Sequence, residues 1–262
     1  MSNAALYVAR TGLDSQSERM RVIANNLANV NTTGFKRDRA EFKTLAYQTM
    51  TAPGAPSSGE NRYAVGLSLG TGVQMSGTAR VNTQGALTTT DNPLDMAIEG
   101  EGFFQVTRPD GTTGYTRAGN FKLSAEGTMV TSDGLPLQPQ IQVPEGAQSV
   151  TIAVDGTVSA QVPGQAEATE LGRIELARFV NPAGLAALGG NLYAETGASG
   201  APLVGTAGLD GRGTLRQGSL EGSNVNVVQE LVDMIETQRA YEVNSKMISA
   251  MDEMLRNANQ QL

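Results

Sequence analysis

Residues 4–30, AALYVARTGLDSQSERMRVIANNLANV, and residues 226–258, NVVQELVDMIETQRAYEVNSKMISAMDEMLRNA, decide the fold of this chain. Apolar side chains recur every seven positions in both stretches: Leu6, Leu13, Met20 and Leu27 in the first, and Val227, Met234, Tyr241, Ile248 and Leu255 in the second. A seven-residue repeat brings these side chains to one side of an α-helix. The sequence therefore predicts a long helix at each end of the chain, each with an apolar seam that a partner helix can cover.

The ends of both helices carry recognisable signals. The first helix is expected from about Ala4 to about Asn29, because residues 31–34, NTTG, favour the left-handed conformation that ends helices. The second helix is expected to begin after Asn226, with Gln229 three positions on, as in a capping box. No Gly or Pro interrupts it before about Asn257.

Four asparagines crowd the last turns of the first helix: Asn25, Asn26, Asn29 and Asn31. Asparagine is a mediocre helix former, which fits a fraying helix end. Buried amides can also fix the register against a neighbouring helix, as polar core residues do in coiled coils. The residues themselves leave both interpretations open.

The middle of the chain, roughly residues 76–220, has the pattern of short strands joined by tight turns. Phe103–Val106 and Tyr115–Arg117 flank Pro109-Asp110-Gly111, which is a hairpin signal. We expect a mostly antiparallel β domain from about 90 to 190, followed by a loose glycine-rich tract over 184–218. Before it, residues 51–59, TAPGAPSSG, are expected to be an extended, poorly packed loop.

Together these patterns predict an α+β fold with three parts. Residues 1–32 and 224–262 would form a terminal helical, coiled-coil domain. Residues 33–90 and 190–223 would form an extended connecting domain, and residues 91–189 a β-rich outer domain inserted between the helices.

Composition excludes several classes of function. A net charge of −7 makes nucleic acid a poor partner. The sequence contains no His and no Cys, which removes imidazole bases, thiolate nucleophiles and the commonest zinc ligands. Four carboxylates lie close together (Asp91, Asp95, Glu99 and Glu101), but the neighbouring Pro93 and glycines indicate turns. We therefore expect no enzyme activity, no catalytic residue, no metal and no cofactor.

The chain also lacks signals for a membrane. No apolar run is long enough to cross a bilayer, so no membrane insertion is expected. The first residues show no basic and apolar regions of a cleavable signal peptide. We expect that the protein either stays in the cytoplasm or leaves it by a route that reads no such signal.

Charge is unevenly distributed along the chain. Residues 1–45 hold seven basic and four acidic residues, a net +3, whereas residues 221–262 hold three basic and seven acidic residues, a net −4. Opposite signs favour pairing of the two ends, although two separately solvated helices fit the charges equally well. A small basic cluster of Lys36, Arg37, Arg39 and Lys43 is interpreted as a solvated face.

Residues 24–37, ANNLANVNTTGFKR, resemble the N-terminal signature of the bacterial flagellar rod and hook protein family. The C-terminal signature is matched by residues 224–228, NVNVV, with 230–232, ELV, and 237–242, TQRAYE. Central segments match as well: residues 92–104, NPLDMAIEGEGFF, and 115–121, YTRAGNF. The resemblance covers essentially the whole chain, and its length, Gly12-Leu13-Asp14 and Leu45–Gly59 are most similar to the distal rod branch.

The resemblance implies a structural subunit that assembles helically into the distal rod, the hollow drive shaft that transmits torque from motor to hook. Terminal helices of many copies would form an inner coiled-coil layer, and the β domain would face outward. Implied partners are further copies of the chain, the proximal rod proteins, the hook protein, the P and L ring proteins and the flagellar type III export apparatus. The implied location is the flagellar basal body from periplasm to outer membrane, after export without a cleaved signal peptide.

Three alternatives remain open. They are a proximal rod subunit, a monomeric periplasmic binding or scaffold protein whose terminal helices close on themselves, and, with least support, an enzyme acting on peptidoglycan. For the favoured assembly, twelve residues are predicted to form the self-assembly interface: Leu6, Leu13, Met20, Asn25, Asn26, Leu27, Asn29, Leu231, Met234, Tyr241, Ile248 and Leu255.

Overall fold

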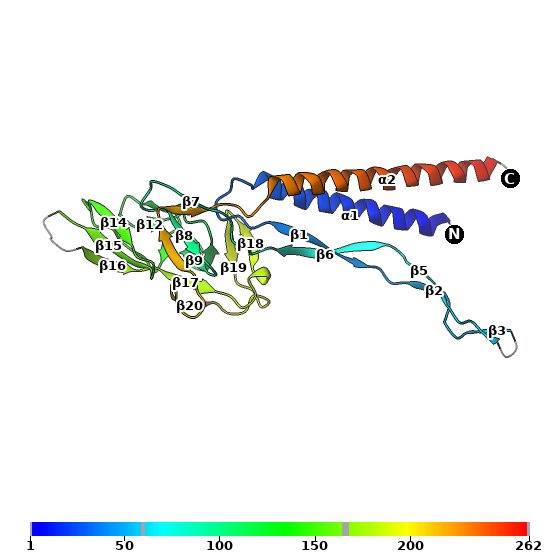
Figure 1. Ribbon diagram of the computed structural model, residues 1–262, viewed down its shortest axis with the longest axis horizontal. Helices are drawn as coiled ribbons and strands as arrows, with labels where there is room; N and C mark the ends of the chain where they lie inside the picture. Colours follow the sequence, from blue (N-terminus) through cyan, green and yellow to red (C-terminus); the bar gives the residue numbers. More distant parts are fainter. Residues whose placement is uncertain (1, 59–60, 164–167, 261–262) are drawn as a thin grey trace. The chain divides into compact units, whose positions relative to one another are not determined.

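The computed structural model describes residues 2–58, 61–163 and 168–260, and it leaves out the side chains of residues 2, 3, 57, 58, 61, 255 and 258–260. The chain divides into two compact units (Figure 1). A helical unit comprises Met1–Leu27, Asp38–Ala79 and Asn226–Leu262, and a β unit comprises Ala28–Arg37 and Arg80–Val225. Residues 38–79 thus group with the helices and residues 190–223 with the β region, so these boundaries differ from the expected ones. The division into three domains stays a prediction.

Two long helices form at the ends of the chain, as the seven-residue spacing of apolar side chains predicts. Helix α1 spans Ser2–Ala28 and α2 spans Val227–Gln260. Asn226 caps α2, because its Oδ1 accepts hydrogen bonds from the N–H groups of Val228 at 3.1 Å and Gln229 at 3.2 Å. The Gln229 side chain donates to Asp233 instead of returning to Asn226, so only half of the expected capping box is present. Among the described residues, no helix is long and apolar enough to cross a membrane.

The two helices run antiparallel within the helical unit. Asn26 lies against Glu230, with 3.2 Å between Nδ2 and Oε2, and Arg19 lies 3.8 Å from Asp233. Further along, Gly12 faces Asn244, and a Cβ on that glycine would lie 3.1 Å from the amide nitrogen. Residues nearer to the start of α1 therefore contact residues further from the start of α2, as in an antiparallel pair. A coiled coil with regular interlocking of apolar side chains stays a prediction.

A two-stranded β ribbon completes the helical unit. Its strands pair as β1 (Asp38–Thr44) with β6 (Val73–Arg80), β2 (Gln48–Thr51) with β5 (Leu67–Leu69), and β3 (Pro56–Ser58) with β4 (Asn61–Arg62). The described part of residues 51–59 is extended and mostly exposed, as expected of a poorly packed segment, but the expected loop is wrong because both ends of this part are paired strands. Gly54 N–H donates to Tyr63 O and Tyr63 N–H donates to Ala55 O, both at 2.9 Å, so cross-strand backbone bonds continue past Pro53.

The β unit is built on one large antiparallel sheet. Its strand order is β18-β19-β10-β9-β17-β20, with β13 also pairing with β9. The strands are β9 (Phe103–Thr107), β10 (Thr113–Thr116), β13 (Leu137–Gln138), β17 (Glu175–Arg178), β18 (Ala186–Gly189), β19 (Leu192–Ala194) and β20 (Leu203–Thr206). The predicted hairpin is confirmed, since β9 and β10 pair across Pro109-Asp110-Gly111.

The β unit also contains smaller sheets. They comprise β14 (Ser149–Ile152) with β15 (Thr157–Gln161) and β16 (Thr169–Arg173), β11 (Lys122–Leu123) with β12 (Met129–Val130), β8 (Met96–Glu99) with β21 (Thr214–Gln217), and β7 (Leu87–Thr89) with β22 (Ser219–Glu221). A short 3₁₀ helix spans Pro182–Gly184. The loose tract expected over residues 184–218 is wrong, because strands β18 to β21 lie within it. Their backbone groups pair with other strands, which removes the cost of leaving them unbonded.

Consecutive side chains of β9 build the two cores of the β unit. Phe104 belongs to the main apolar core, where it meets Phe121 edge-to-face at 5.1 Å between ring centroids. Phe103 points to the other face, into a smaller cluster with Tyr115, Phe179 and Tyr193. This split follows from the alternation of side chains along a strand.

Candidate self-assembly surface

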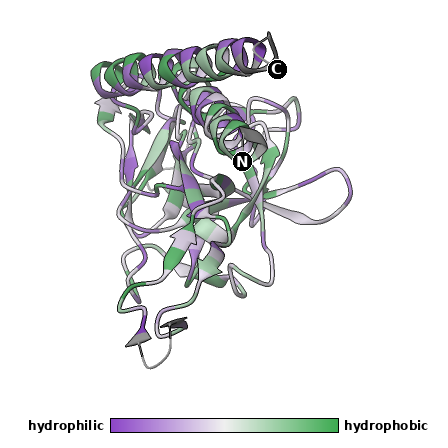
Figure 2. Cartoon of the chain, turned by 90° about the vertical axis from the view of Figure 1, so that its right-hand side faces the viewer, coloured by the Kyte–Doolittle hydropathy of each residue, from purple (hydrophilic) through white to green (hydrophobic). Residues whose placement is uncertain are grey.

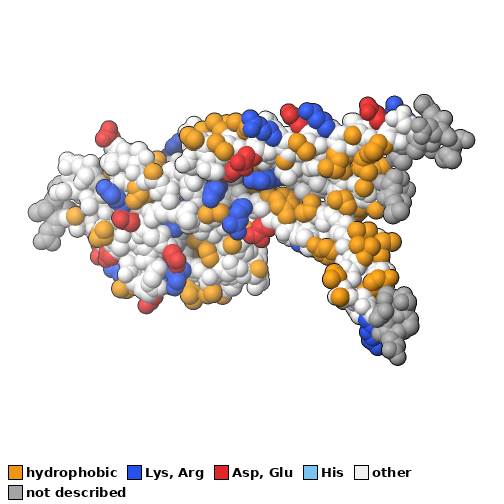
Figure 3. Space-filling model, turned by 45° about the vertical axis from the view of Figure 1, so that its right-hand side comes forward, with side chains coloured by type: hydrophobic (Ala, Val, Ile, Leu, Met, Phe, Trp, Pro, Cys, Tyr) orange, Lys and Arg blue, Asp and Glu red, His pale blue; other side chains and the backbone are white. Residues whose placement is uncertain are grey.

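Helix α2 exposes most of its apolar side chains. The exposed large apolar residues of its described part are Val227, Val228, Leu231, Val232, Ile235, Tyr241, Val243, Met247 and Met254. Hydrophobic and hydrophilic residues alternate along α2 in Figure 2, and Figure 3 shows hydrophobic side chains gathered on the helices and on the β ribbon. Large contiguous apolar surfaces mark sites of interaction.

The buried residues of α2 are polar. In the described part of this helix, only Glu230, at 3% exposure, and Thr237, at 1%, are buried. The Thr237 hydroxyl donates to Asp233 O at 2.6 Å, so its polar group is satisfied within the helix. A helix that closes a monomer buries its apolar stripe and exposes its polar residues. In α2 most polar residues are exposed too, but both buried residues of its described part are polar, and most of its large apolar residues stay open to other molecules.

Asn26 is the polar residue that joins the elements of the helical unit. It is 2% exposed. Its Oδ1 accepts from Asp38 N–H at 3.0 Å, and its Nδ2 donates to Asp38 O at 2.9 Å and to Glu230 Oε2 at 3.2 Å. The amide therefore binds both backbone groups of the first ribbon residue and a carboxylate of α2. Of the two interpretations of the asparagine cluster, a specific buried contact holds for Asn26.

The predicted interface residues occupy different environments within the chain. Leu231, Tyr241 and Asn25 are exposed, Asn26 is buried, and the rest of the described set is half-buried: Leu6, Leu13, Met20, Leu27, Asn29, Met234 and Ile248. Leu255 falls within α2, but its side chain lies outside the described residues. The structure brings Asn26 of α1 to Glu230 of α2, a residue that the interface prediction missed. The role of the twelve residues in assembly stays a prediction.

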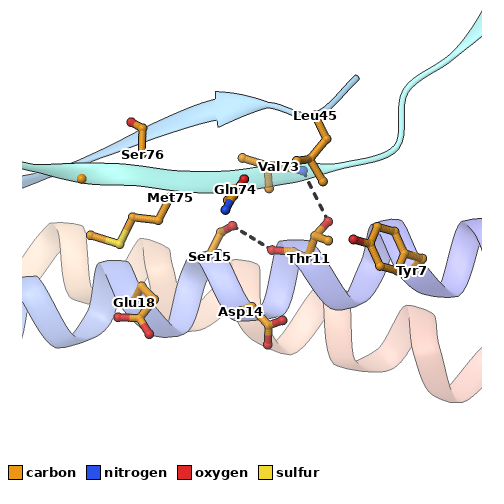
Figure 4. A pocket seen from close by; sticks show the side chains of 11 residues that line it. Tyr7, Thr11, Asp14, Ser15, Glu18, Leu45, Val73, Gln74, Met75 and Ser76 are labelled. Carbon is orange, nitrogen blue, oxygen red and sulfur yellow. Dashed lines mark hydrogen bonds between the residues drawn. The ribbon is translucent and has the colours of Figure 1, made fainter. Parts of the chain in front are cut away.

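A hollow of about 630 Å³ lies between α1 and strand β6 (Figure 4). Thr11 holds the two elements together there, because its Oγ1 accepts from Val73 N–H at 3.4 Å. Ser15 Oγ in turn donates to Thr11 O at 2.7 Å. Gly72 has a φ of 116°, and a Cβ at this position would collide with the Thr11 hydroxyl. This close approach explains why a glycine precedes Val73.

A second, more apolar groove lies between α1, α2 and the ribbon. Its lining includes Ala5 and Val8 of α1, Met247 of α2, and Met50 and Leu69 of the ribbon. Met50 and Met247 are 62% and 48% exposed, so the groove continues the exposed apolar surface of α2. Apolar surface of the helical unit is thus contributed by all three of its elements.

The β unit contains a buried charge cluster formed by Lys36, Arg117 and Glu221. Their side chains are 1%, 6% and 0% exposed. Glu221 accepts from Lys36 Nζ at 2.5 Å, from Arg117 at 3.2 Å and from Gly85 N–H at 3.0 Å. The interpretation of residues 36–43 as a solvated face is therefore wrong for Lys36. Burial lowers the pKa of Lys36 and of Arg117, because desolvation disfavours the charged form, while Glu221 opposes that effect.

The sequence motifs meet around this cluster. Lys36 comes from the N-terminal motif and Arg117 from the segment 115–121, and Glu221 precedes the C-terminal motif. Asn224 also connects the motifs, since it accepts from Arg37 N–H at 2.8 Å and donates to Val81 O at 2.8 Å. No sequence signal predicted the cluster, because Lys36 and Glu221 are 185 residues apart.

Two of the four carboxylates near residue 95 have structural roles. Asp95 accepts from Thr90 Oγ1 at 2.7 Å and from Asn92 Nδ2 at 2.9 Å, which holds the turn before β8. Glu101 pairs with Arg178 at 2.7 Å. Over the described part of the chain, no group of three or more His, Cys, Asp and Glu residues could hold a metal ion.

Comparisons with known proteins agree with a structural role. Three family models match, described as "Flagella basal body rod protein" over residues 6–36, "Flagellar hook protein FlgE/F/G D1 domain" over 97–160 and "Flagellar basal body rod FlgEFG protein C-terminal" over 216–261. The chain is 52% identical to the flagellar basal-body rod protein FlgG of Buchnera aphidicola (Acyrthosiphon pisum) over 98% of both chains. FlgG of Agrobacterium fabrum is 48% identical, over 95% of this chain and 96% of the relative, and FlgG of Caulobacter vibrioides is 45% identical over 98% of both.

The fold, the exposed apolar helices and these relatives define a structural protein rather than an enzyme. The chain belongs to the flagellar basal-body rod protein family. It is a structural subunit of the distal rod of the flagellar basal body.

Proposed function

We propose that this rod subunit polymerises helically into a hollow shaft by covering the apolar residues of α1 and α2 with the helices of neighbouring copies. The observation that carries the proposal is that the described part of α2 exposes nine large apolar side chains and buries only Glu230 and Thr237. Such a surface is costly in water and is removed from it when copies associate.

The free energy available from burying this surface is comparable with the cost of association. Full burial of a Val, Leu, Ile or Met side chain contributes about 1.5–3 kcal/mol. The α2 residues are already partly covered, so each retains roughly half of that contribution, about 1 kcal/mol. The eight Val, Leu, Ile and Met residues among the nine therefore offer about 8 kcal/mol per copy, against an association cost of about 4–15 kcal/mol. A copy that contacts several neighbours adds the surfaces of α1 and the ribbon to this total.

The charges of the two ends support contacts between copies. Residues 1–45 carry a net +3 and residues 221–262 a net −4. Complementary charges guide the encounter of helices and disfavour contacts between like ends, while they add little to affinity. We propose a terminal helical layer made of residues 1–32 and 224–262, and an outer layer made by the β region 91–189, with residues 33–90 and 190–223 connecting them.

The place of the shaft follows from this proposal. It would span from periplasm to outer membrane and transmit torque between motor and hook. Its other contacts would be the proximal rod proteins, the hook protein and the P and L ring proteins. The subunit would reach the site through the flagellar export apparatus without a cleaved signal peptide.

A pair of matched variants tests the mechanism of assembly. Ile235→Asn removes an apolar side chain that is 50% exposed, and Gln238→Asn makes a polar change at an exposed position of the same helix. Both place asparagine in the interior of α2, so both reduce helix propensity. We expect Ile235→Asn to raise the chain concentration needed for polymers in sedimentation by about fivefold or more, and Gln238→Asn to leave it nearly unchanged. Equal effects of the two changes, or a wild-type chain that stays monomeric at high concentration, would favour the closed monomeric scaffold instead.

A further inference from the structure

Methionines are distributed unequally between the two units of the chain. In the β unit, Met96 and Met129 both belong to the main apolar core and are 0% exposed. The other described methionines lie in the helical unit, where Met50, Met247 and Met254 are exposed and the rest are half-buried. In the described part of the chain, the methionine side chains that solvent reaches therefore belong to the unit that carries the proposed assembly surface.

Two of the exposed methionines line the same apolar groove of the helical unit. Met50 of β2 and Met247 of α2 face this space, which has a volume of about 970 Å³, together with Ala5 and Val8 of α1. No charged side chain lines the groove within the described part of the chain. Methionine is common at surfaces that bind partners, because its flexible, polarisable side chain adapts to irregular contacts. A polar group added to either sulfur atom would therefore lie in an otherwise apolar contact.

Oxidation by hydrogen peroxide adds such a polar group. The sequence contains no Cys, so methionine supplies all of its sulfur atoms. A lone pair of the thioether sulfur attacks one peroxide oxygen, the O–O bond breaks, and the departing hydroxide takes the remaining proton and leaves as water. The sulfur is oxidised to a sulfoxide and the peroxide is reduced, each by two electrons. The product is polar and chiral, and it disrupts interfaces that depend on methionine.

We propose that Met50 and Met247 are modification sites, at which oxidation to the sulfoxide by a peroxide blocks assembly of the subunit. This inference rests on the proposed function, because it concerns a surface that a second copy covers. Covering a sulfoxide oxygen with apolar groups removes its hydrogen bonds to water, which is costly. The β unit keeps its fold, because its methionines are buried in the core. Methionine sulfoxide reductases reverse the modification, since two thiols are oxidised to a disulfide while the sulfoxide oxygen leaves as water.

Sedimentation of the full chain, treated with hydrogen peroxide that is then removed, tests the proposal. Peptide mass spectrometry first locates the sulfoxides, and it should find them at Met50 and Met247 while Met96 and Met129 stay reduced. We expect the chain concentration needed for polymers to rise about tenfold or more, and to return after treatment with both methionine sulfoxide reductases and dithiothreitol. An unchanged concentration after treatment, or modification of Met96 and Met129 to the same extent as Met50 and Met247, would overturn the proposal.

Leucine variants make the test specific. The double variant Met50→Leu, Met247→Leu keeps apolar side chains of similar volume but has no sulfur to oxidise at either position. It should form polymers as readily as wild type before treatment, and treatment should raise the required concentration by less than about threefold.

Met254→Leu is the matched control, because Met254 is 61% exposed on the same helix as Met247 but does not line the groove. This variant should stay as sensitive to peroxide as wild type. Equal sensitivity of the double variant and wild type would overturn the proposal. An untreated wild-type chain that stays monomeric would instead refute the proposed function, and the proposed control of assembly with it, so the two failures are seen in different samples.

Discussion

Replacing Gly34 with Ala tests whether residues 28–37, the part of the N-terminal motif in the β unit, are held in place by direct backbone packing. Gly34 has a φ of 69°, and its N–H donates to Glu221 O at 2.7 Å. A Cβ there would lie 2.7 Å from the carbonyl carbon of Arg117 and 2.8 Å from Ala118 N. These are backbone atoms, so they cannot move aside as the end of a flexible side chain can.

The expected loss of stability has two parts. The left-handed backbone conformation costs an alanine about 1–2 kcal/mol, and forcing a methyl group against packed atoms costs about 1–3 kcal/mol more. Gly111 provides the control, because it has a φ of 80° in the same unit and a Cβ added there would meet nothing within 4 Å. Gly111→Ala should therefore lose only the first part, about 1–2 kcal/mol.

Urea unfolding measures both variants. Tyrosine fluorescence reports on the β unit, because Tyr115 and Tyr193 are buried there at 3% and 5% exposure, whereas Tyr7, Tyr47 and Tyr63 are exposed. With a slope of about 2 kcal/mol per molar urea, the additional loss in Gly34→Ala lowers its midpoint by about 0.5–1.5 M below that of Gly111→Ala. Equal midpoints in the two variants would refute the packing argument and leave only backbone strain.

Two further predictions concern the buried charge cluster and the terminal helices. Burial lowers the pKa of Lys36 in the folded chain. Between that lowered pKa and 10.5, the unfolded chain therefore binds more protons than the folded chain does. The contribution of Lys36 to the free energy of unfolding consequently rises with pH in this range. Urea unfolding of wild type and Lys36→Met between pH 8 and 10.5 should therefore show wild type gaining stability relative to the variant, and a constant difference would contradict a pKa lowered by burial. In hydrogen exchange on dilute monomer, the amides of residues 231–254 of α2 should exchange faster than those of β9, because this helix alone buries so few apolar side chains. The same amides should become protected when the chain assembles. Strong protection in the monomer would contradict this prediction.

The helices and the central hairpin could be predicted because their signals are local. Apolar residues seven positions apart predict helix α2 whatever packs against it. In the same way, Pro109-Asp110-Gly111 predicts the turn between β9 and β10. The ribbon of residues 38–80 could not be predicted in the same way. Only residues 63–75 show an alternation, in which Tyr, Val, Leu and Met alternate with small or polar residues, and it predicts a short strand or an extended crossover there. The other ribbon strands have mostly exposed side chains and no such signal, and Pro and Gly suggest a loop over residues 51–59.

Lys36 shows the same limit for the site. In the sequence it stands among other basic and acidic residues, which is typical of a solvated face, yet it is buried against Glu221. Asn26 could be singled out as part of an unusual run of amides. Its partners, Asp38 and Glu230, follow only from the way the chain returns to α1.

The sequence by itself determined that both ends are amphipathic helices, that the middle is antiparallel β-structure and that the chain lacks the residues of common active sites. These properties depend on residue type and on spacing over a few residues, and neither depends on what packs against a helix or a turn. Only the tertiary structure decided that α2 buries Glu230 and Thr237 while most of its large apolar residues stay exposed, and that Lys36, Arg117 and Glu221 share one buried cluster. Burial and charge pairing depend on segments far apart along the chain, so no local pattern specifies them.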